Sequence, residues 1–171
     1  MGDRVDLFYN RIFRAYGNII RGNIMDAKYW MKKSLKDLTR EEWEALCDGC
    51  GQCCLFRLED EDTGEIFTTN IACKLLCHET CTCLDYSHRF EIIPNCLQLS
   101  SENVAKLSWL PRTCAYRLVS VHMDLPEWHP LKTGRSESVH QAGISVKGKI
   151  ISEELVDPEQ YFDYVVDWWD E

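Results

Sequence analysis

The chain has 171 residues, of which 45% are apolar and 27% are charged, a composition typical of one domain with extensions. Its net charge of −9 is unevenly spread: residues 1–40 carry nine Lys and Arg against four Asp and Glu, and residues 41–171 carry ten against twenty-four. Because an acidic body repels phosphate backbones, this distribution argues against nucleic-acid binding by the larger part of the chain.

Residues 1–37 are predicted to form a basic helical extension. Apolar side chains recur there at three- and four-residue steps, which is the spacing of one helix face. They are Val5, Phe8, Ile12, Tyr16 and Ile19. Such a face usually covers its own core, although it can also lie on an anionic membrane or dock to a protein partner. With no export signal and no apolar run of roughly 20 residues, we expect a cytoplasmic protein without a transmembrane segment.

The first firm helix signal is Thr39-Arg-Glu-Glu42, a capping box in which Thr39 and Glu42 satisfy each other's backbone donors. The helix that follows leads directly to Cys47. Residues 55–58 and 65–69 then flank an acidic turn that contains Gly64, a pattern that predicts a short hairpin.

The second half of the chain has weaker signals. Residues 71–97 hold cysteines but few periodic hydrophobic residues, so their order is expected to come from ligation rather than from apolar burial. Ser100 is predicted to cap a helix that runs to about Leu107. Residues 144–151 have the alternation of a strand, with a bulge or hairpin at Gly148.

Residues 156–171 are predicted to form an aromatic C-terminal helix that packs on the domain. Asp157 suits its cap and Pro158 its first position. The apolar face would consist of Tyr161, Phe162, Val165, Val166, Trp168 and Trp169. So aromatic a face could alternatively dock to a protein partner.

Ten cysteines fall between Cys47 and Cys114. Disulfide frameworks belong to secreted chains, whereas clustered thiols in a reducing cytosol favour a bound metal. The sulfurs of Cys47 and Cys50 can converge on one ion, helped by the conformational freedom of the intervening glycine. Adding Cys53 gives the opening of a bacterial ferredoxin motif, but the Cys-Pro that closes that motif is missing.

The remaining thiols leave their grouping open. Adjacent residues point in different directions, so Cys53 and Cys54 are not expected to bind the same ion. In an extended segment Cys81 and Cys83 would share one face and complement the first group, with Cys73 and Cys96 as the next candidates. Two four-cysteine sites and a single cluster both remain open, and thiolate ligation suits both zinc and an iron–sulfur cluster.

Several uncommon strings occur in one order in this chain. They include Leu46-Cys-Asp-Gly-Cys-Gly-Gln-Cys-Cys54, Trp109-Leu-Pro-Arg-Thr-Cys-Ala-Tyr-Arg117 and Leu125-Pro-Glu-Trp-His-Pro-Leu131. Over roughly residues 38–155 the chain resembles the bacterial YcgN-like family of CxxCxxCC proteins. The resemblance implies a zinc- or iron-chelating domain without naming a reaction. It carries over Cys47, Cys50, Cys53, Cys54, Cys73, Cys81, Cys83, Cys96 and Cys114, but not Cys77.

We therefore predict a small, loop-rich α+β domain, organised by metal over residues 38–155. His129 could ligate the metal or exchange protons, although a hydrogen-bonded structural role is the simpler interpretation. The sequence lacks a nucleophile elbow, a phosphate-binding glycine loop and a zinc-protease helix. Three hypotheses remain: a structural metalloprotein, a metal chelator or chaperone, and an iron–sulfur redox enzyme or electron carrier.

Overall fold

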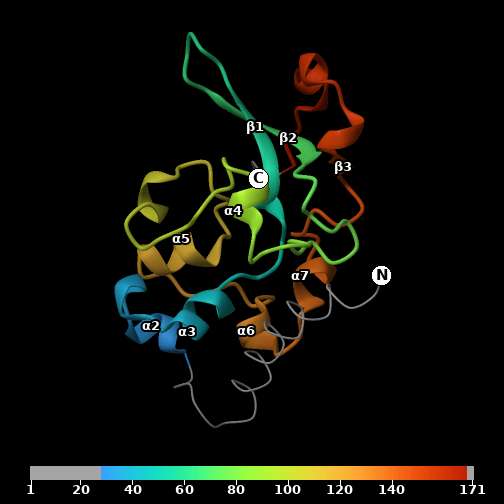
Figure 1. Cartoon of the computed structure of the whole chain (residues 1–171). Coiled ribbons are helices and arrows are strands. Elements are labelled where there is room, and N and C mark those ends of the chain that lie inside the picture. Colours follow the sequence, from blue (N-terminus) through green and yellow to red (C-terminus); the bar gives the residue numbers. More distant parts are fainter. Residues whose placement is uncertain (1–27, 169–171) are drawn as a thin grey trace.

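The computed structural model describes residues 28–168, which form a mixed α+β domain with long loops (Figure 1). The predicted fold class is confirmed. The α-helices are α2 (Tyr29–Lys32), α3 (Arg40–Ala45), α4 (Arg89–Ile92), α5 (Ala115–Ser120), α6 (Pro130–Thr133) and α7 (Ser138–Gln141). The 3-10 helices are η1 (Leu35–Asp37), η2 (Gln52–Cys54), η3 (Val104–Lys106), η4 (Glu153–Leu155) and η5 (Pro158–Tyr164). No helix in this part of the chain is long and apolar enough to cross a bilayer.

The sheet has three strands in the order β1-β2-β3. Strands β1 (Leu55–Glu59) and β2 (Ile66–Ala72) form the predicted antiparallel hairpin, whose turn projects away from the body (Figure 1). Its acidic turn is closed by Asp60, whose carboxylate accepts hydrogen bonds from the backbone N–H groups of Asp62 and Thr63. The short strand β3 (Ile151–Ser152) pairs in parallel with the end of β2. The hairpin begins at Leu55, directly after the cysteine-rich residues 47–54.

Helix α3 begins at the capping box that the sequence predicts. The Glu42 backbone donates to the Thr39 hydroxyl at 3.2 Å, and the Thr39 backbone donates to the Glu42 carboxylate at 2.8 Å. The helix ends at Ala45, and the next residue, Leu46, is completely buried. This burial fixes the position from which Cys47 leaves the helix.

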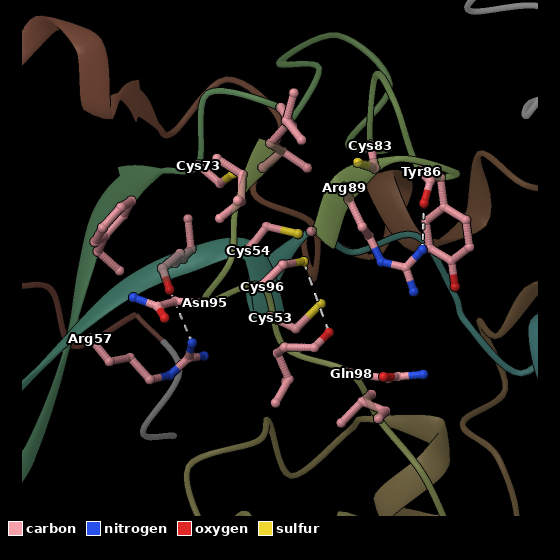
Figure 2. A pocket seen from close by; sticks show the side chains of 18 of the residues that line it. Cys53, Cys54, Arg57, Cys73, Cys83, Tyr86, Arg89, Asn95, Cys96 and Gln98 are labelled. Atoms are coloured by element: carbon pink, nitrogen blue, oxygen red, sulfur yellow. Dashed lines mark hydrogen bonds between the residues drawn. The ribbon is translucent and has the colours of Figure 1, made fainter. Parts of the chain in front are cut away.

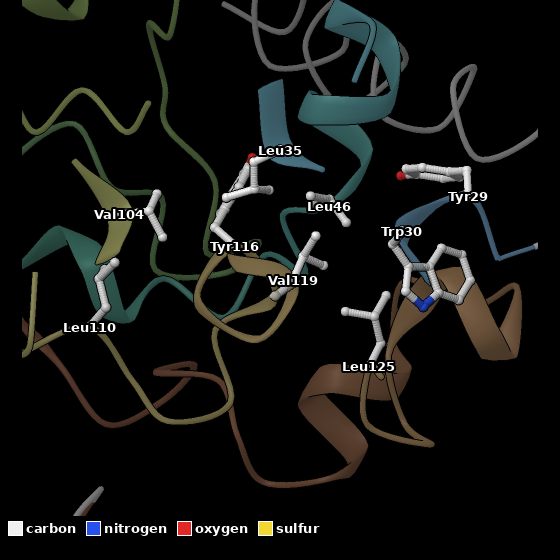
Figure 3. Close-up of a cluster of buried hydrophobic side chains, with 10 residues drawn as sticks. Tyr29, Trp30, Leu35, Leu46, Val104, Leu110, Tyr116, Val119 and Leu125 are labelled. Atoms are coloured by element: carbon white, nitrogen blue, oxygen red, sulfur yellow. The ribbon is translucent and has the colours of Figure 1, made fainter. Parts of the chain in front are cut away.

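The larger hydrophobic core joins the first helices to α5 (Figure 3). Its members include Tyr29, Trp30, Leu35, Leu46, Val104, Leu110, Tyr116, Val119 and Leu125. Three of them, Tyr29, Trp30 and Leu35, belong to the predicted N-terminal extension, so its end packs into this core. The predicted helix over residues 5–19 lies outside the described residues.

A smaller core lies beneath the sheet. It contains Leu55, Ala72, Leu76, Cys81 and Val146. The backbone N–H of Val146 donates to the Cys50 carbonyl at 2.9 Å, and the Gln52 side chain donates to the Ile144 carbonyl at 2.7 Å. These bonds fix the cysteine-rich loop between the two cores.

Two predicted elements are much shorter in the structure. The helix expected from Ser100 to Leu107 is reduced to η3, because the Asn103 side chain bonds to the backbone of Gln98 and Ser100 in a competing turn. The strand expected over residues 144–151 begins only at Ile151. Gly148 has a positive φ of 74°, which turns the chain instead of extending it.

The C-terminal segment begins as predicted but is not an α-helix. The Asp157 carboxylate accepts a hydrogen bond from the Glu159 backbone and Pro158 takes the first position, yet η5 ends at Tyr164. Val165 then bridges to Thr69 of β2, and the Phe162 side chain is 62% exposed. Residues beyond 168, including Trp169, lie outside the described part. The segment thus contacts the sheet without forming a core helix.

Asp124 joins the N-terminal segment to α6. Its carboxylate accepts hydrogen bonds from the Trp30 indole at 2.8 Å and the Lys28 ammonium at 3.3 Å, and pairs with Lys132 at 3.0 Å. The Trp30 hydrogen bond, supported by those from Lys132 and Leu125, holds the pKa of Asp124 well below its usual range. The ionised carboxylate therefore stabilises the fold.

We expect Asp124→Asn to lower the free energy of unfolding by about 1 kcal/mol at pH 7, a value reduced by solvent screening of this partly exposed group. A carboxylate with a lowered pKa stabilises the folded state above its unfolded pKa of about 3.9, and this contribution is lost as the pH falls further. Denaturant titrations of both proteins should therefore give a constant difference between pH 7 and pH 5 that shrinks below about pH 4. A difference that grows in acid would contradict this assignment.

Candidate metal centre

The loop after α3 turns back on itself through two glycines. Gly49 and Gly51 have positive φ angles of 75° and 77°. Between them, the Cys50 backbone N–H donates to the Asp48 carboxylate at 2.9 Å. This winding, which glycine permits at little cost, lets the cysteines of the loop face inward rather than alternate outward.

Cys114 reaches this loop from more than sixty residues away. It is the residue that precedes α5, and it packs with Cys47 against the larger core. The Tyr116 hydroxyl donates to the Trp43 carbonyl of α3 at 3.0 Å, which ties the two helices together. Packing of the core therefore carries Cys114 to the ends of the loop.

Four of the thiols form an inner group, defined as Cys47, Cys50, Cys53 and Cys114. Burial raises the pKa of Cys47 and Cys50 well above the ordinary value, and the nearby Asp48 carboxylate and Cys53 thiol raise it further. Burial also raises the pKa of Cys114 to about 12, with Asp48 and Cys53 again close by. Cys47, Cys50 and Cys114 therefore stay protonated at neutral pH unless a cation replaces their protons.

A second set forms an outer group, defined as Cys54, Cys73, Cys83 and Cys96. The hydrogen bond to Cys53 raises the pKa of Cys54, followed by burial and the thiols of Cys73 and Cys83. Cys96 in turn lies close enough to Cys73 and Cys83 to raise their pKa values, after burial. The Cys73 backbone N–H donates to the Cys54 carbonyl at 3.0 Å.

Cys53 and Cys54 connect the two groups. The Cys54 thiol donates a hydrogen bond to the Cys53 sulfur, which lowers the pKa of Cys53, and the Arg57 guanidinium lowers it as well. The two sulfurs are thus neighbours, and the expectation that Cys53 and Cys54 bind different ions stays a prediction. Cys53 is exposed, and its side chain lines a cavity.

That cavity has a volume of about 830 Å³. Figure 2 shows the side chains of Cys53, Cys54, Cys73, Cys83 and Cys96 around it, with Arg57 and Arg89 on its two sides. Among residues 28–168, no three Cys, His, Asp or Glu side chains already meet in ligating geometry. Binding an ion would therefore require the thiols to move inward into this space.

Arg57 and Arg89 line the cavity, and each lies next to thiols. The Arg57 guanidinium lies 4.1 Å from the Trp109 ring centre and donates to the carbonyls of Leu55 and Gln52. Burial lowers the pKa of Arg57, whereas the thiolates of Cys53, Cys54 and Cys50 counteract this effect. Arg89 lies 3.6 Å from the Tyr86 ring centre and donates a hydrogen bond to Cys96.

Two unpaired polar atoms test whether a thiolate-bound cation fits here. Within the described residues, Asp48 Oδ2 and Arg57 Nε are buried without hydrogen-bond partners. A cation held by the inner group would compensate the Asp48 oxygen, and an anionic thiolate would accept from Arg57 Nε. The donor set is composed of soft sulfur ligands, which suit zinc and iron–sulfur clusters. The residues present therefore fit the thiolate-bound metal that the sequence predicts.

Cys81 also lines the cavity, and Cys77 is the thiol beside it. Cys81 has a positive φ of 54°, so the extended conformation predicted for residues 81–83 is wrong and the two sulfurs do not share a face. Cys83 joins the outer group, whereas Cys81 packs in the smaller core beside Ser145 and Cys77. Its backbone N–H donates to the Cys77 carbonyl at 2.8 Å.

His129 has a structural position. It is completely buried; its Nδ1 accepts from the Leu131 backbone at 3.1 Å, and its Nε2 lies 3.1 Å from the Leu46 carbonyl. Since Nδ1 is an acceptor, Nε2 carries the proton and donates to Leu46. Burial lowers the pKa of His129, which keeps the ring neutral. Both ring nitrogens are thus occupied, and Nε2 holds Leu46, the residue that precedes Cys47.

We expect His129→Ala to lower the free energy of unfolding by about 3 kcal/mol, because it leaves a cavity and an unpaired buried carbonyl at Leu46. The metal content per folded chain should stay unchanged, since the imidazole is not a ligand. Denaturant titration and elemental analysis measure the two quantities. His140→Ala is a suitable control, because the half-buried His140 ring bonds to the Ser145 hydroxyl. Loss of metal from a folded His129→Ala protein would restore the ligand interpretation.

Known proteins resemble this chain in its cysteine pattern and over most of its length. A family model called CxxCxxCC, described as a "putative zinc- or iron-chelating domain", matches residues 46–115. The UPF0260 protein mll2411 of Mesorhizobium japonicum is 50% identical over 145 residues, which cover 84% of this chain and 98% of that relative. The chain belongs to the CxxCxxCC family.

Other CxxCxxCC relatives extend the agreement beyond the cysteines. A UPF0260 protein of Rhizobium etli is 51% identical over 143 residues, covering 84% of this chain and 90% of the relative. A UPF0260 protein of Brucella melitensis is 52% identical over 143 residues, covering 82% and 94%. No solved structure matches the chain. Family membership supports metal binding and leaves the choice between zinc and iron open.

Sequence reasoning missed two features of this site. It left the division of the thiols open, because Cys114 and Cys96 reach their neighbours only through the tertiary fold. It also overlooked Arg57 and Arg89, since a single arginine in a strand or loop gives no signal of a neighbouring thiol. The rare Cys-Cys pair at Cys53 and Cys54 was the one available sign of two groups.

Proposed function

We propose that this protein binds zinc or iron through eight cysteine thiolates arranged as the inner and outer groups. The observation that carries the proposal is the gathering of thiols from four separate stretches of chain around one cavity, with an arginine beside each group. Thiolates so close together repel one another, and a bound cation removes this repulsion. Cys77 and Cys81 are left out of the ligand set.

The two groups could each hold one zinc ion, or they could hold iron–sulfur clusters. Zinc would act as a structural centre, whereas an iron–sulfur cluster would accept and release electrons. Arg57 and Arg89 support either occupant, because they offset the negative charge of the thiolates and donate N–H groups toward sulfur. The redox alternative is favoured specifically by the direct link between the groups at Cys53 and Cys54.

Purification of the full chain without oxygen, followed by elemental analysis and a visible spectrum, tests the proposal. Two zinc ions per chain and no visible absorption would establish a zinc protein. Iron with acid-labile sulfide, and absorption that dithionite bleaches reversibly, would establish the redox alternative. A fully folded chain that contains neither zinc nor iron would overturn the proposal.

The remaining expectations follow from charge and exposure. The acidic balance of residues 41–171 supports a role without nucleic acid, and clustered reduced thiols support a cytoplasmic location. A protein partner could contact the C-terminal segment, where the side chains of Phe162 and Trp168 are 62% and 38% exposed. Co-purification with tagged full-length chain, compared between wild type and Phe162→Ala, measures that contact.

A further inference from the structure

We infer that the two thiol groups form sites of unequal lability: the inner group retains its ion, and the outer group exchanges a divalent cation with acceptor ligands in solution. This inference rests on the proposed function, because it requires that both groups bind metal. It assigns metal handling to one half of the centre and structural support to the other.

The inner group is anchored by the larger core. Cys47 follows the completely buried Leu46, whose carbonyl is held by His129. Cys114 immediately precedes α5, of which four of the six residues are buried. Moving either sulfur away from an ion would disturb these packed elements. Release from the inner group therefore requires an opening of the core, which is among the costliest motions in a protein.

The outer group draws two ligands from a stretch that contacts the larger core only near its end, through the partly buried Leu97 and Leu99. Residues 82–103 include Cys83 and Cys96 but no buried residue. Their only α-helix is the single turn α4, and the apolar side chains of Leu84, Phe90 and Ile92 are 36–42% exposed. With so little apolar burial, this stretch can open locally at a small fraction of the cost of global unfolding.

A few polar contacts fasten the stretch to the body. The Leu84 backbone donates to the Leu75 carbonyl at 2.7 Å, and the Tyr86 hydroxyl donates to the Glu44 carboxylate of α3 at 2.9 Å. Arg89 belongs to the same stretch and contacts Cys96, so the charge that stabilises the thiolates moves together with them. Opening would thus weaken the outer site in a single step, while Cys54 stays directly before β1 and Cys73 directly after β2.

The cavity provides the route of exchange. It is bordered by this stretch and by the thiols of both groups, so an acceptor can approach the outer ion when residues 82–103 open. Exchange is a ligand substitution without electron transfer. The donor atoms of the acceptor replace the four thiolates around the cation, and the freed thiolates take up protons from water.

Chelator competition on the full chain, loaded with zinc under reducing conditions, tests this inference. Mixing with excess 4-(2-pyridylazo)resorcinol should release one equivalent at least roughly 100-fold faster than the other, as expected when one site opens locally and the other only with the core. Cys96→Ser should abolish the fast phase and retain one slowly released zinc ion. Cys77→Ser is the matched control and should leave both phases unchanged.

Cadmium substitution of the wild-type chain gives a second measurement that needs no variant. Two ¹¹³Cd resonances in the tetrathiolate region are expected, and a limiting amount of chelator should remove only one of them. Two zinc ions released at the same rate, or a slow phase lost in Cys96→Ser, would overturn the inference while leaving the proposed function intact. Fewer than two ions per chain would overturn the proposed function itself.

Discussion

Removing the metal from the full chain is expected to expose the backbone of residues 82–103 to solvent while leaving α5 protected. The stretch has no buried residue, so ligation by Cys83 and Cys96 would supply the free energy that orders it. A structural zinc site contributes on the order of 10 kcal/mol to the folded state. Residues 115–120 keep their apolar contacts in either state.

Hydrogen–deuterium exchange of the metal-loaded and chelator-treated chain, followed by peptide mass spectrometry, measures this effect. Peptides from residues 82–103 should lose at least about 100-fold in protection, consistent with local unfolding, and peptides from α5 should change little. The hairpin of β1 and β2 is the internal reference, because twelve residues of paired strand do not depend on the outer thiols. Unchanged protection of 82–103 after complete metal removal would show that burial, not ligation, orders this stretch.

Substituting Gly51 by Ala is expected to lower the free energy of unfolding by about 4 kcal/mol, far more than the same change at Gly49. Both glycines have a positive φ, which costs a residue with a Cβ about 1 kcal/mol. Only at Gly51 would the new Cβ also collide, since it would lie 2.7 Å from Val146 Cγ2 and 3.3 Å from Cys81 Cβ. At Gly49 nothing lies within 4 Å of the added atom.

The two variants form a matched pair, because they change the same atoms in the same loop with nearly the same φ. Denaturant titration of each, compared with wild type under identical metal loading, isolates the collision at Gly51. Gly51→Ala should also lower the affinity for metal, because moving Val146 would disturb its hydrogen bond to Cys50. Equal losses of stability in both variants would mean that φ strain alone sets the cost.

The sequence was informative wherever structure depends on near neighbours. The capping box at Thr39 and Glu42 and the hairpin around Gly64 both follow from contacts within a few residues, and both are present. The predictions for residues 100–107 and 144–151 were too long, because an Asn103 turn and the positive φ of Gly148 overrode apolar periodicity. At the C-terminus the cap of η5 was predicted correctly. The burial predicted for its aromatic side chains depended on contacts with segments far away in the sequence.

For the site, the amino-acid sequence by itself determined the supply of ligands: ten thiols, with turn glycines between the first of them, and a Cys-Cys pair. Only the tertiary structure decided which thiols are neighbours. The larger core brings Cys114 to Cys47, the positive φ of Cys81 turns its sulfur away, and Arg57 and Arg89 arrive beside the two groups. The physical reason is that grouping depends on distances between segments far apart in the chain, which packing sets and local spacing does not encode.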